Sequence, residues 1–436
     1  MTRARALTAG AAVALAAAAL LLGSAFRGSS AAAPPPPAGA ADRFQAGFAL
    51  GDTSALVASL QQELRDHPRD AHAWALLGLA YQQRAREVAD PSYYPKSEGA
   101  LRRALRLTPN DLVATSGLAS LALSRHRFRQ ALELARRAHG LSPTTAQVYG
   151  LLGDAELELG RYQASFADFD RLARLKPSLA AYSRVSYARE LLGRPAAAVA
   201  AMREALDAAT GEREPTAWTR VQLGKIYWSQ GRLGAAAAQY RAALSVFPGY
   251  VHALDALAQV EGARGRSGRA IALERQAVAE TPLPQFVGYL GDLYAAAGRS
   301  ALARRQYALV DVIRRLQVAN GVETDLETAL FRADHGVRLR ETVALARQAR
   351  QERPSIDGDD VLAWTLERNG RCGEALRHSQ LALRLGTRDA LKLFHRGMIE
   401  RCLGRTAEGN RFLRRALALN PHFSLLWAPV ARRALR

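Results

Sequence analysis

The sequence has few residues suited to redox or metal chemistry. Its 436 residues include two cysteines, three methionines and nine histidines, and the histidines are scattered without metal-ligand spacing. The motifs HExxH, GxxxxGKS/T and GxSxG are absent, so nothing indicates a metalloprotease, a P-loop nucleotide site or a hydrolase elbow. We predict no catalytic residue, no metal site and no cofactor, and we expect that the chain is not an enzyme. His335 follows an aspartate, but we interpret it as a helix C-terminal residue capped by Gly336.

Aromatic residues and lysine are also scarce. Aromatics make up 7% of the chain, while alanine, leucine and arginine dominate, a composition that favours helices over strands. The formal charge of +20 is almost all arginine, because the lysines are only Lys96, Lys176, Lys225 and Lys392. The arginines are spread along the chain, which indicates a solvated basic surface. The alternative is a footprint for a polyanion, either nucleic acid or an anionic envelope polymer; the sequence does not favour nucleic acid.

The first 40 residues differ from the rest. Arg3 and Arg5 precede an uncharged apolar run over residues 6–26. We expect residues 1–27 to be either a cleaved signal peptide, ending near Ala25 or Ala32, or a retained membrane anchor. Residues 28–40 are a Pro/Ala-rich linker. Both interpretations predict an extracytoplasmic location, secreted or anchored in the cell membrane, because the positive end stays inside.

A Gly-Arg pair recurs along the chain at a period close to 34 residues. It occurs at Gly160, Gly193, Gly231, Gly265, Gly298, Gly370 and Gly404, each followed by arginine. Glycine takes a left-handed conformation at low cost and therefore ends helices. The period predicts helical hairpins with a turn at each pair.

The clearest unit is residues 216–248. It carries Leu223, Gly224 and Tyr227 on one helical face, then Ala236, Tyr240 and Ala243 on a second, and ends at Pro248. A glycine inside a helix costs about 1 kcal/mol relative to alanine, so we predict that Gly224 lies at a close helix crossing. The pattern resembles the tetratricopeptide repeat (TPR), with Arg220 where the first aromatic usually stands.

About eleven such units follow one another over roughly 90% of the chain. The resemblance implies an all-α fold, an α-solenoid (superhelix) of TPR-like hairpins closed by a C-terminal capping helix from about Ser424. We expect an N-terminal part of the solenoid over residues 41–320 and a C-terminal part over 321–436. The second unit is interrupted by an insertion at residues 89–96, and the second helix of the eighth runs to about Ala319.

The stretch from Tyr307 to the end resembles the closing half of a group of exported bacterial TPR proteins, through segments such as ETDLETALFRADHG and ALNPHFS. The resemblance supports the architecture and the compartment more than a particular activity.

The resemblance also implies that the first helix of each pair lines a concave groove that binds peptide segments of other proteins. Mixed aromatic and charged side chains suit that task. The predicted partner-binding residues are Arg184, Tyr187, Trp218, Gln222, Lys225, Trp228, His252, Asp255, Gln259, Tyr289 and Asp292. Glu190 shares the same face. The alternative for Trp218 and Trp228 is packing beneath neighbouring helices.

The two cysteines, Cys372 and Cys402, lie 30 residues apart near the turns of neighbouring hairpins. In an oxidising compartment they can form a disulfide; the alternative is two small buried thiols.

The sequence thus predicts a non-catalytic scaffold that binds other proteins, with membrane association through residues 6–26. Two alternatives stay open: an accessory subunit of an envelope polymer assembly or transport complex, and a polyanion binder using the arginine-rich surface.

Overall fold

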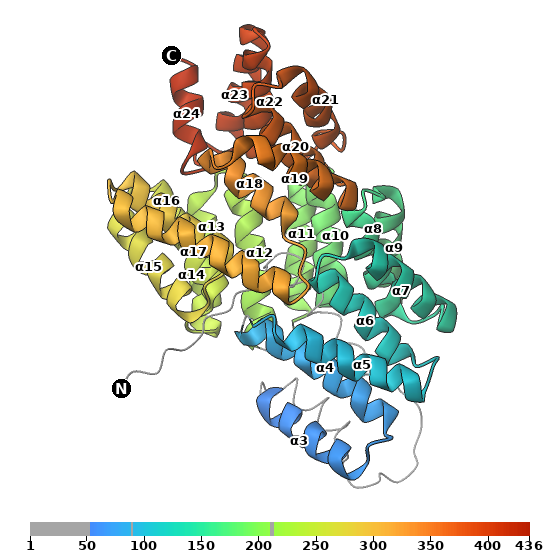
Figure 1. Cartoon of the computed structure of the whole chain (residues 1–436). Coiled ribbons are helices and arrows are strands. Elements are labelled where there is room, and N and C mark those ends of the chain that lie inside the picture. Colours follow the sequence, from blue (N-terminus) through green and yellow to red (C-terminus); the bar gives the residue numbers. More distant parts are fainter. Residues whose placement is uncertain (1–52, 89, 210–212) are drawn as a thin grey trace, which may run out of the picture. The chain divides into compact units, whose positions relative to one another are not determined.

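The computed structural model describes residues 53–88, 90–209 and 213–436. These residues form 22 α-helices and no strand, and consecutive helices pair into hairpins (Figure 1). The predicted all-α solenoid is therefore confirmed. The expected signal peptide or anchor, the linker and the first helix of the first hairpin fall outside the described residues.

The described helices divide between two compact units. The first unit comprises residues up to 157, 161–181 and 315–323. Its helices are α3 (Thr53–Asp66), α4 (Ala71–Val88), α5 (Tyr93–Leu107), α6 (Leu112–Ser124), α7 (Phe128–Leu141), α8 (Ala146–Glu158) and α9 (Tyr162–Leu175).

The second unit comprises residues 158–160, 182–314 and 324–436, so the division falls within α8, α10 and α17. Its helices are α10 (Leu179–Leu191), α11 (Pro195–Asp207), α12 (Arg213–Ser229), α13 (Leu233–Val246), α14 (Val251–Ala263), α15 (Ser267–Glu280), α16 (Pro284–Ala296), α17 (Ser300–Ala319), α18 (Asp325–His335), α19 (Leu339–Glu352), α20 (Ile356–Glu367), α21 (Cys372–Ala382), α22 (Ala390–Cys402), α23 (Thr406–Leu419) and α24 (Trp427–Ala434).

The Gly-Arg pairs are the hairpin turns. All seven glycines have φ between 67° and 78°, the left-handed region that only glycine occupies without steric cost. The hairpin of α6 and α7 has no glycine at this place, and His126 adopts φ 59° instead. Its ring nitrogen Nδ1 lies 2.8 Å from the Glu323 carbonyl oxygen, a contact that helps to hold the strained residue.

Gly224 lies at a close helix crossing, as predicted. A Cβ atom there would overlap the ring of Tyr240, which is 2% exposed. Gly153 meets Phe169 and Gly291 meets Tyr307 in the same way. In these three hairpins the aromatic ring of the second helix rests on the backbone of the first, and in two others Leu101 and Leu413 lie on Gly78 and Gly397. This contact sets the distance between paired helices.

The insertion in the second hairpin forms less loop than expected. Helix α5 begins at Tyr93, so only residues 89–92 separate α4 from α5. Pro95 is tolerated because the first turn of a helix lacks N–H acceptors and does not need its missing N–H. The inserted residues therefore lengthen the hairpin as well as its turn.

Three loops of the C-terminal hairpins contact earlier hairpin turns of the second unit. Arg353 pairs with Glu158. The Thr387 hydroxyl donates to the Leu191 carbonyl at 2.6 Å, and the Asn420 amide donates to the Trp228 carbonyl at 2.9 Å. These contacts join residues almost 200 positions apart, which nearest-neighbour stacking of repeats does not do.

The last helix, α24, is shorter than the predicted 424–436 segment and caps an aromatic core. The indole rings of Trp427 and Trp364 lie 5.1 Å apart, edge to face. Both donate to the Asp334 carboxylate, at 2.9 and 2.8 Å. Phe394 and His395 are fully buried in this core, so both residues pack within it.

Candidate partner-binding face

The residues predicted for the concave groove lie on helices α10, α12, α14 and α16. These residues and Glu190 are together called the first-helix face. Tyr187 and Lys225 are exposed, while Arg184 and Asp255 are buried at 3% and 8% exposure. The remaining residues are half-buried: Glu190, Trp218, Gln222, Trp228, His252, Gln259, Tyr289 and Asp292. The residues available to a partner are therefore mainly the aromatic ones, Glu190 and Lys225.

Glu190 and Lys225 are ionisable groups without a direct partner among the described residues. Neither side chain has a hydrogen bond or an ion pair with the described part of the chain. Partial removal from water raises the pKa of Glu190 to about 7, and the charge of Asp389 adds to the shift. The protein around Lys225 lowers its pKa by desolvation, although its side chain is open to solvent, and Asp255 and Glu190 partly oppose the shift. Such desolvated, unpaired groups are typical of sites that bind a ligand.

His252 is neutral at this face. Burial, assisted by the charge of Lys225, lowers its pKa to about 3. The rings of Tyr250 and Phe286 lie 5.3 and 5.6 Å from the imidazole. His252 therefore acts as part of an aromatic wall rather than as a charged contact.

A buried carboxyl pair lies beneath the face. Asp255 accepts two hydrogen bonds from the Gln259 amide, at 3.1 and 3.0 Å. Burial raises the pKa of Asp255 to about 6 and raises that of its neighbour Glu274 further, where the charge of Asp255 adds to the shift. Burial therefore favours the protonated form of this pair. The sequence analysis missed Glu274, because it lies on a second helix, α15.

Asp292 is already engaged within the chain. The Tyr307 hydroxyl donates to its carboxylate at 2.8 Å, and Nε2 of His335 lies 2.8 Å from the same oxygen. Nδ1 of His335 lies 2.7 Å from the Phe331 carbonyl, and Gly336 caps the helix at φ 68°. This confirms the prediction that His335 is a helix C-terminal residue.

The two tryptophans differ in their contacts. The Nε1 atom of Trp218 is buried and has no hydrogen-bond partner in residues 213–436 or the other described segments. Trp228 is half-buried, and its carbonyl accepts the hydrogen bond from Asn420. Both side chains retain exposed area, and their role in binding stays a prediction.

Three charged residues near the face were missed by sequence analysis. Lys392, which is 9% exposed, pairs with Asp357 at 2.7 Å and with Asp389 at 3.1 Å. This triad acts on the pKa of Tyr187 and Glu190. No sequence signal could have found it, because it belongs to hairpins almost 200 positions further along the chain.

Cys372 and Cys402 form a disulfide with their Cα atoms 6.1 Å apart. It joins the start of α21 to the end of α22, at the turns of two consecutive hairpins. The bond fixes how these two hairpins stack.

Among the described residues, no group of three or more histidine, cysteine, aspartate or glutamate residues is arranged to hold a metal ion. No helix in the same residues is both long and apolar enough to span a membrane. Residues 6–26 lie outside the described residues.

Repeated hairpins with a glycine turn and an aromatic ring on a small residue define an α-solenoid, a class that presents extended surfaces for interaction. Sequence models of the tetratricopeptide repeat match residues 116–180, 177–249 and 221–283. The chain therefore contains tetratricopeptide repeats over residues 116–283. Its repeats indicate a scaffold for protein–protein interaction, and proteins of this fold are generally non-catalytic.

Several solved structures are similar to the chain. A thermophilic TPR protein from Thermus thermophilus is 24% identical, covering 44% of this chain and 98% of its own, with a TM-score of 0.39. YrrB, a TPR protein with an unusual peptide-binding site, is 19% identical, with coverages of 43% and 95% and a TM-score of 0.29. Human IFIT1, a dimer with PPP-AAAA, is 15% identical, with coverages of 93% and 94% and a TM-score of 0.49. No curated protein matches the chain.

Proposed function

We propose that the chain is a non-catalytic scaffold that holds peptide segments of partner proteins against the first-helix face. The observation that carries this proposal is the pair Glu190 and Lys225. Glu190 is half-buried and Lys225 is exposed on the same face, and neither has a hydrogen bond or ion pair with the described residues. A peptide with a basic and an acidic group would pair with both and offset the cost of removing Glu190 from water.

The aromatic residues of the face favour a peptide over a small ligand. Tyr187 and Tyr289 present partly exposed rings on either side of Lys225 in chain order, and neither hydroxyl has a hydrogen bond within the described residues. Rigid aromatic side chains give a large contact area at a low cost in conformational entropy. Main-chain amides of an extended peptide would satisfy the two hydroxyl groups.

The binding test uses random peptides displayed on phage and selected on the purified chain. We expect that the combined change Glu190→Ala and Lys225→Ala lowers the affinity of selected peptides at least about tenfold, because two charge-assisted contacts are lost. The matched control is Glu204→Ala with Lys96→Ala, which removes the same charges from exposed positions on α11 and α5. Equal affinity for the wild-type chain and the Glu190/Lys225 variant would exclude this face as the binding site.

We also propose that the repeats work outside the cytoplasm. The basic start and the apolar run of residues 6–26 support export, and the disulfide Cys372–Cys402 supports an oxidising compartment. The N-terminus of protein recovered from fractionated cells tests this. A start after Ala25 or Ala32 indicates a cleaved signal peptide, and an intact start in the membrane fraction indicates an anchor. An intact start in the cytosolic fraction, with two free thiols, contradicts export.

A further inference from the structure

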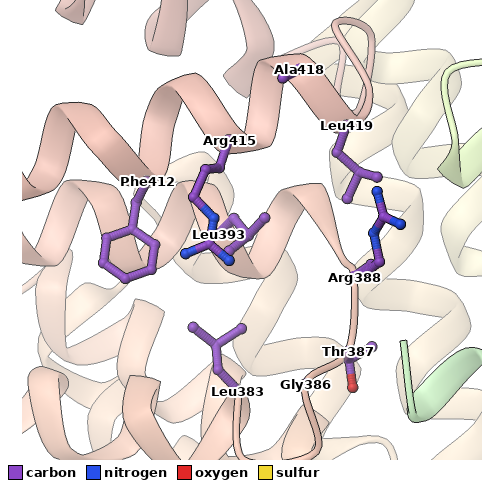
Figure 2. Close-up of a pocket in the computed structure, with 9 residues that line it drawn as sticks. All are labelled: Leu383, Gly386, Thr387, Arg388, Leu393, Phe412, Arg415, Ala418 and Leu419. Carbon is purple, nitrogen blue, oxygen red and sulfur yellow. The ribbon is translucent and has the colours of Figure 1, made fainter. Parts of the chain in front are cut away.

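A pocket separate from the first-helix face lies in the C-terminal hairpins of the second unit. Its volume is about 480 Å³, within the range of sites for small ligands or a few side chains. It is formed by the end of α21, the α21–α22 loop, α22 and α23. The lining residues are Leu383, Gly386, Thr387, Arg388, Leu393, Phe412, Arg415, Ala418 and Leu419 (Figure 2).

Two arginines give the pocket its charge. Arg388 extends from the loop toward Leu419, and Arg415 extends from α23 toward Leu393 (Figure 2). Both are exposed, and neither has a hydrogen bond or ion pair within residues 53–88, 90–209 and 213–436. The lining includes no acidic residue. The pocket therefore offers two guanidinium groups to an anion. The guanidinium is the cationic group that best matches the geometry of a carboxylate.

The walls of the pocket are apolar. Leu383, Leu393, Phe412 and Leu419 line it beside the arginines. The Phe412 ring lies 5.3 Å from the Arg415 guanidinium and 5.1 Å from that of Arg396. In proteins that bind single-stranded nucleic acid, the bases stack on exposed aromatic rings. The Phe412 ring is a poor platform for such stacking, because arginine side chains cover it. The combination fits an apolar side chain next to a carboxylate.

We infer that this pocket is a second binding site, for an acidic peptide segment of a partner protein with leucine or phenylalanine beside aspartate or glutamate. The surrounding charge supports an acidic partner, because residues 401–436 hold eight arginines and one glutamate. The chain's own segment 1–52 fits poorly, since its only acidic residues are Asp42 and Asp52. This inference does not depend on binding at the first-helix face.

The test measures fluorescence anisotropy of labelled peptides in which aspartate or glutamate alternates with leucine or phenylalanine. We expect that Arg388→Ala with Arg415→Ala lowers their affinity at least about tenfold. The matched control is Arg414→Ala with Arg433→Ala, two exposed arginines outside the lining that change the net charge equally. We expect less than about a twofold change in the control. Peptides with asparagine and glutamine for the acids, or alanine for the apolar residues, should bind more weakly.

Three results would overturn the inference. The first is no binding by any acidic peptide of the set. The second is an equal loss of affinity in both double variants, which would indicate diffuse attraction to the arginine surface. The third is displacement of the peptides by polyuridylate at the same or a lower concentration of anionic groups, which would indicate a nucleic-acid site. Lys225→Ala should leave this binding unchanged, which separates the two sites. Glu190 does not serve as this control, because it interacts with Asp389, the residue that follows Arg388.

Discussion

Replacing Gly224 by alanine tests the packing that defines the hairpin. In a helix interior, alanine favours the folded state by about 1 kcal/mol relative to glycine. At Gly224, however, the new Cβ would occupy the space of the Tyr240 ring. That ring is 2% exposed and has no open space to enter. Displacing it costs about 1–3 kcal/mol, so we expect Gly224→Ala to be destabilising by up to about 2 kcal/mol.

The same repeat contains the control. Gly234 lies in α13, and a Cβ atom there would meet nothing within 4 Å. We therefore expect Gly234→Ala to stabilise the chain by up to about 1 kcal/mol, from helix propensity alone. Gly234 is the second residue of α13, so its propensity gain is at most that of Gly224 inside α12. The difference between the two variants is therefore a lower limit on the packing cost.

The assay is urea denaturation followed by circular dichroism. Native-state hydrogen exchange of the α12 and α13 amides then locates the change within the hairpin. A second change, Tyr240→Ala, removes the ring and should remove most of the penalty of Gly224→Ala, giving a favourable coupling of about 1 kcal/mol or more in a double-mutant cycle. If Gly224→Ala and Gly234→Ala shift the midpoint equally, the close crossing at Gly224 is refuted.

Three further predictions concern charge and covalent linkage. The pKa of Glu190 is about 7 in the folded chain, above the unfolded value of 4.5. Between these two values the folded chain binds more protons than the unfolded chain, so stability falls as the pH rises through about 7. Glu190→Gln should therefore match the wild type near pH 4 and exceed it near pH 8, by at most about 3 kcal/mol, in urea denaturation. Reducing the disulfide, or changing Cys372 and Cys402 to serine, should cost about 3.6 kcal/mol, the value for a sequence separation of 30, measured by denaturation with and without dithiothreitol. Lys392→Met should cost about 1–3 kcal/mol at pH 7, because carboxylates such as Asp389 lose their partner, and the loss should shrink as pH falls and these groups are protonated.

Each of these predictions has an outcome that contradicts it. An equal stability difference at pH 4 and pH 8 would show that Glu190 titrates normally in the folded chain. Two thiols reactive toward Ellman's reagent in the native protein would show that the cysteines are not bonded. If Lys392→Met is neutral at pH 7, the triad contributes nothing net to stability. Lys96→Met, at an exposed position, is the matched control for the lysine change.

Local signals were sufficient for the hairpins. A left-handed residue is needed at each turn, and only glycine provides it at low cost, so the turns are readable as Gly-Arg pairs. The crossing at Gly224 is readable for a similar reason, since a glycine within a helix requires a compensating contact. His126 has the same left-handed backbone conformation, but no glycine marks this turn in the sequence. It is held by a contact with Glu323, a residue far along the chain.

The electrostatics of the face were beyond the sequence. Repeat position placed Lys225 and Asp255 on first helices. Only the fold shows that Asp255 is buried beside Glu274 and that Lys225 has no direct partner among the residues the structure describes. A pKa depends on burial and on every charge nearby, and most of those charges come from other hairpins. The pocket around Arg388 was likewise hidden, because it joins helices and a loop from adjacent repeats.

The sequence by itself therefore determined the repeat, its turns and the helical pairing, because these depend on contacts between residues close in the chain. The tertiary structure alone decided the contacts of Arg353 with Glu158 and of Asn420 with Trp228. It also decided the arrangement of Lys392 with its two aspartates. Such contacts join residues from many hairpins and depend on the small rotation between successive repeats, summed over the unit. No residue pattern within one repeat encodes that sum.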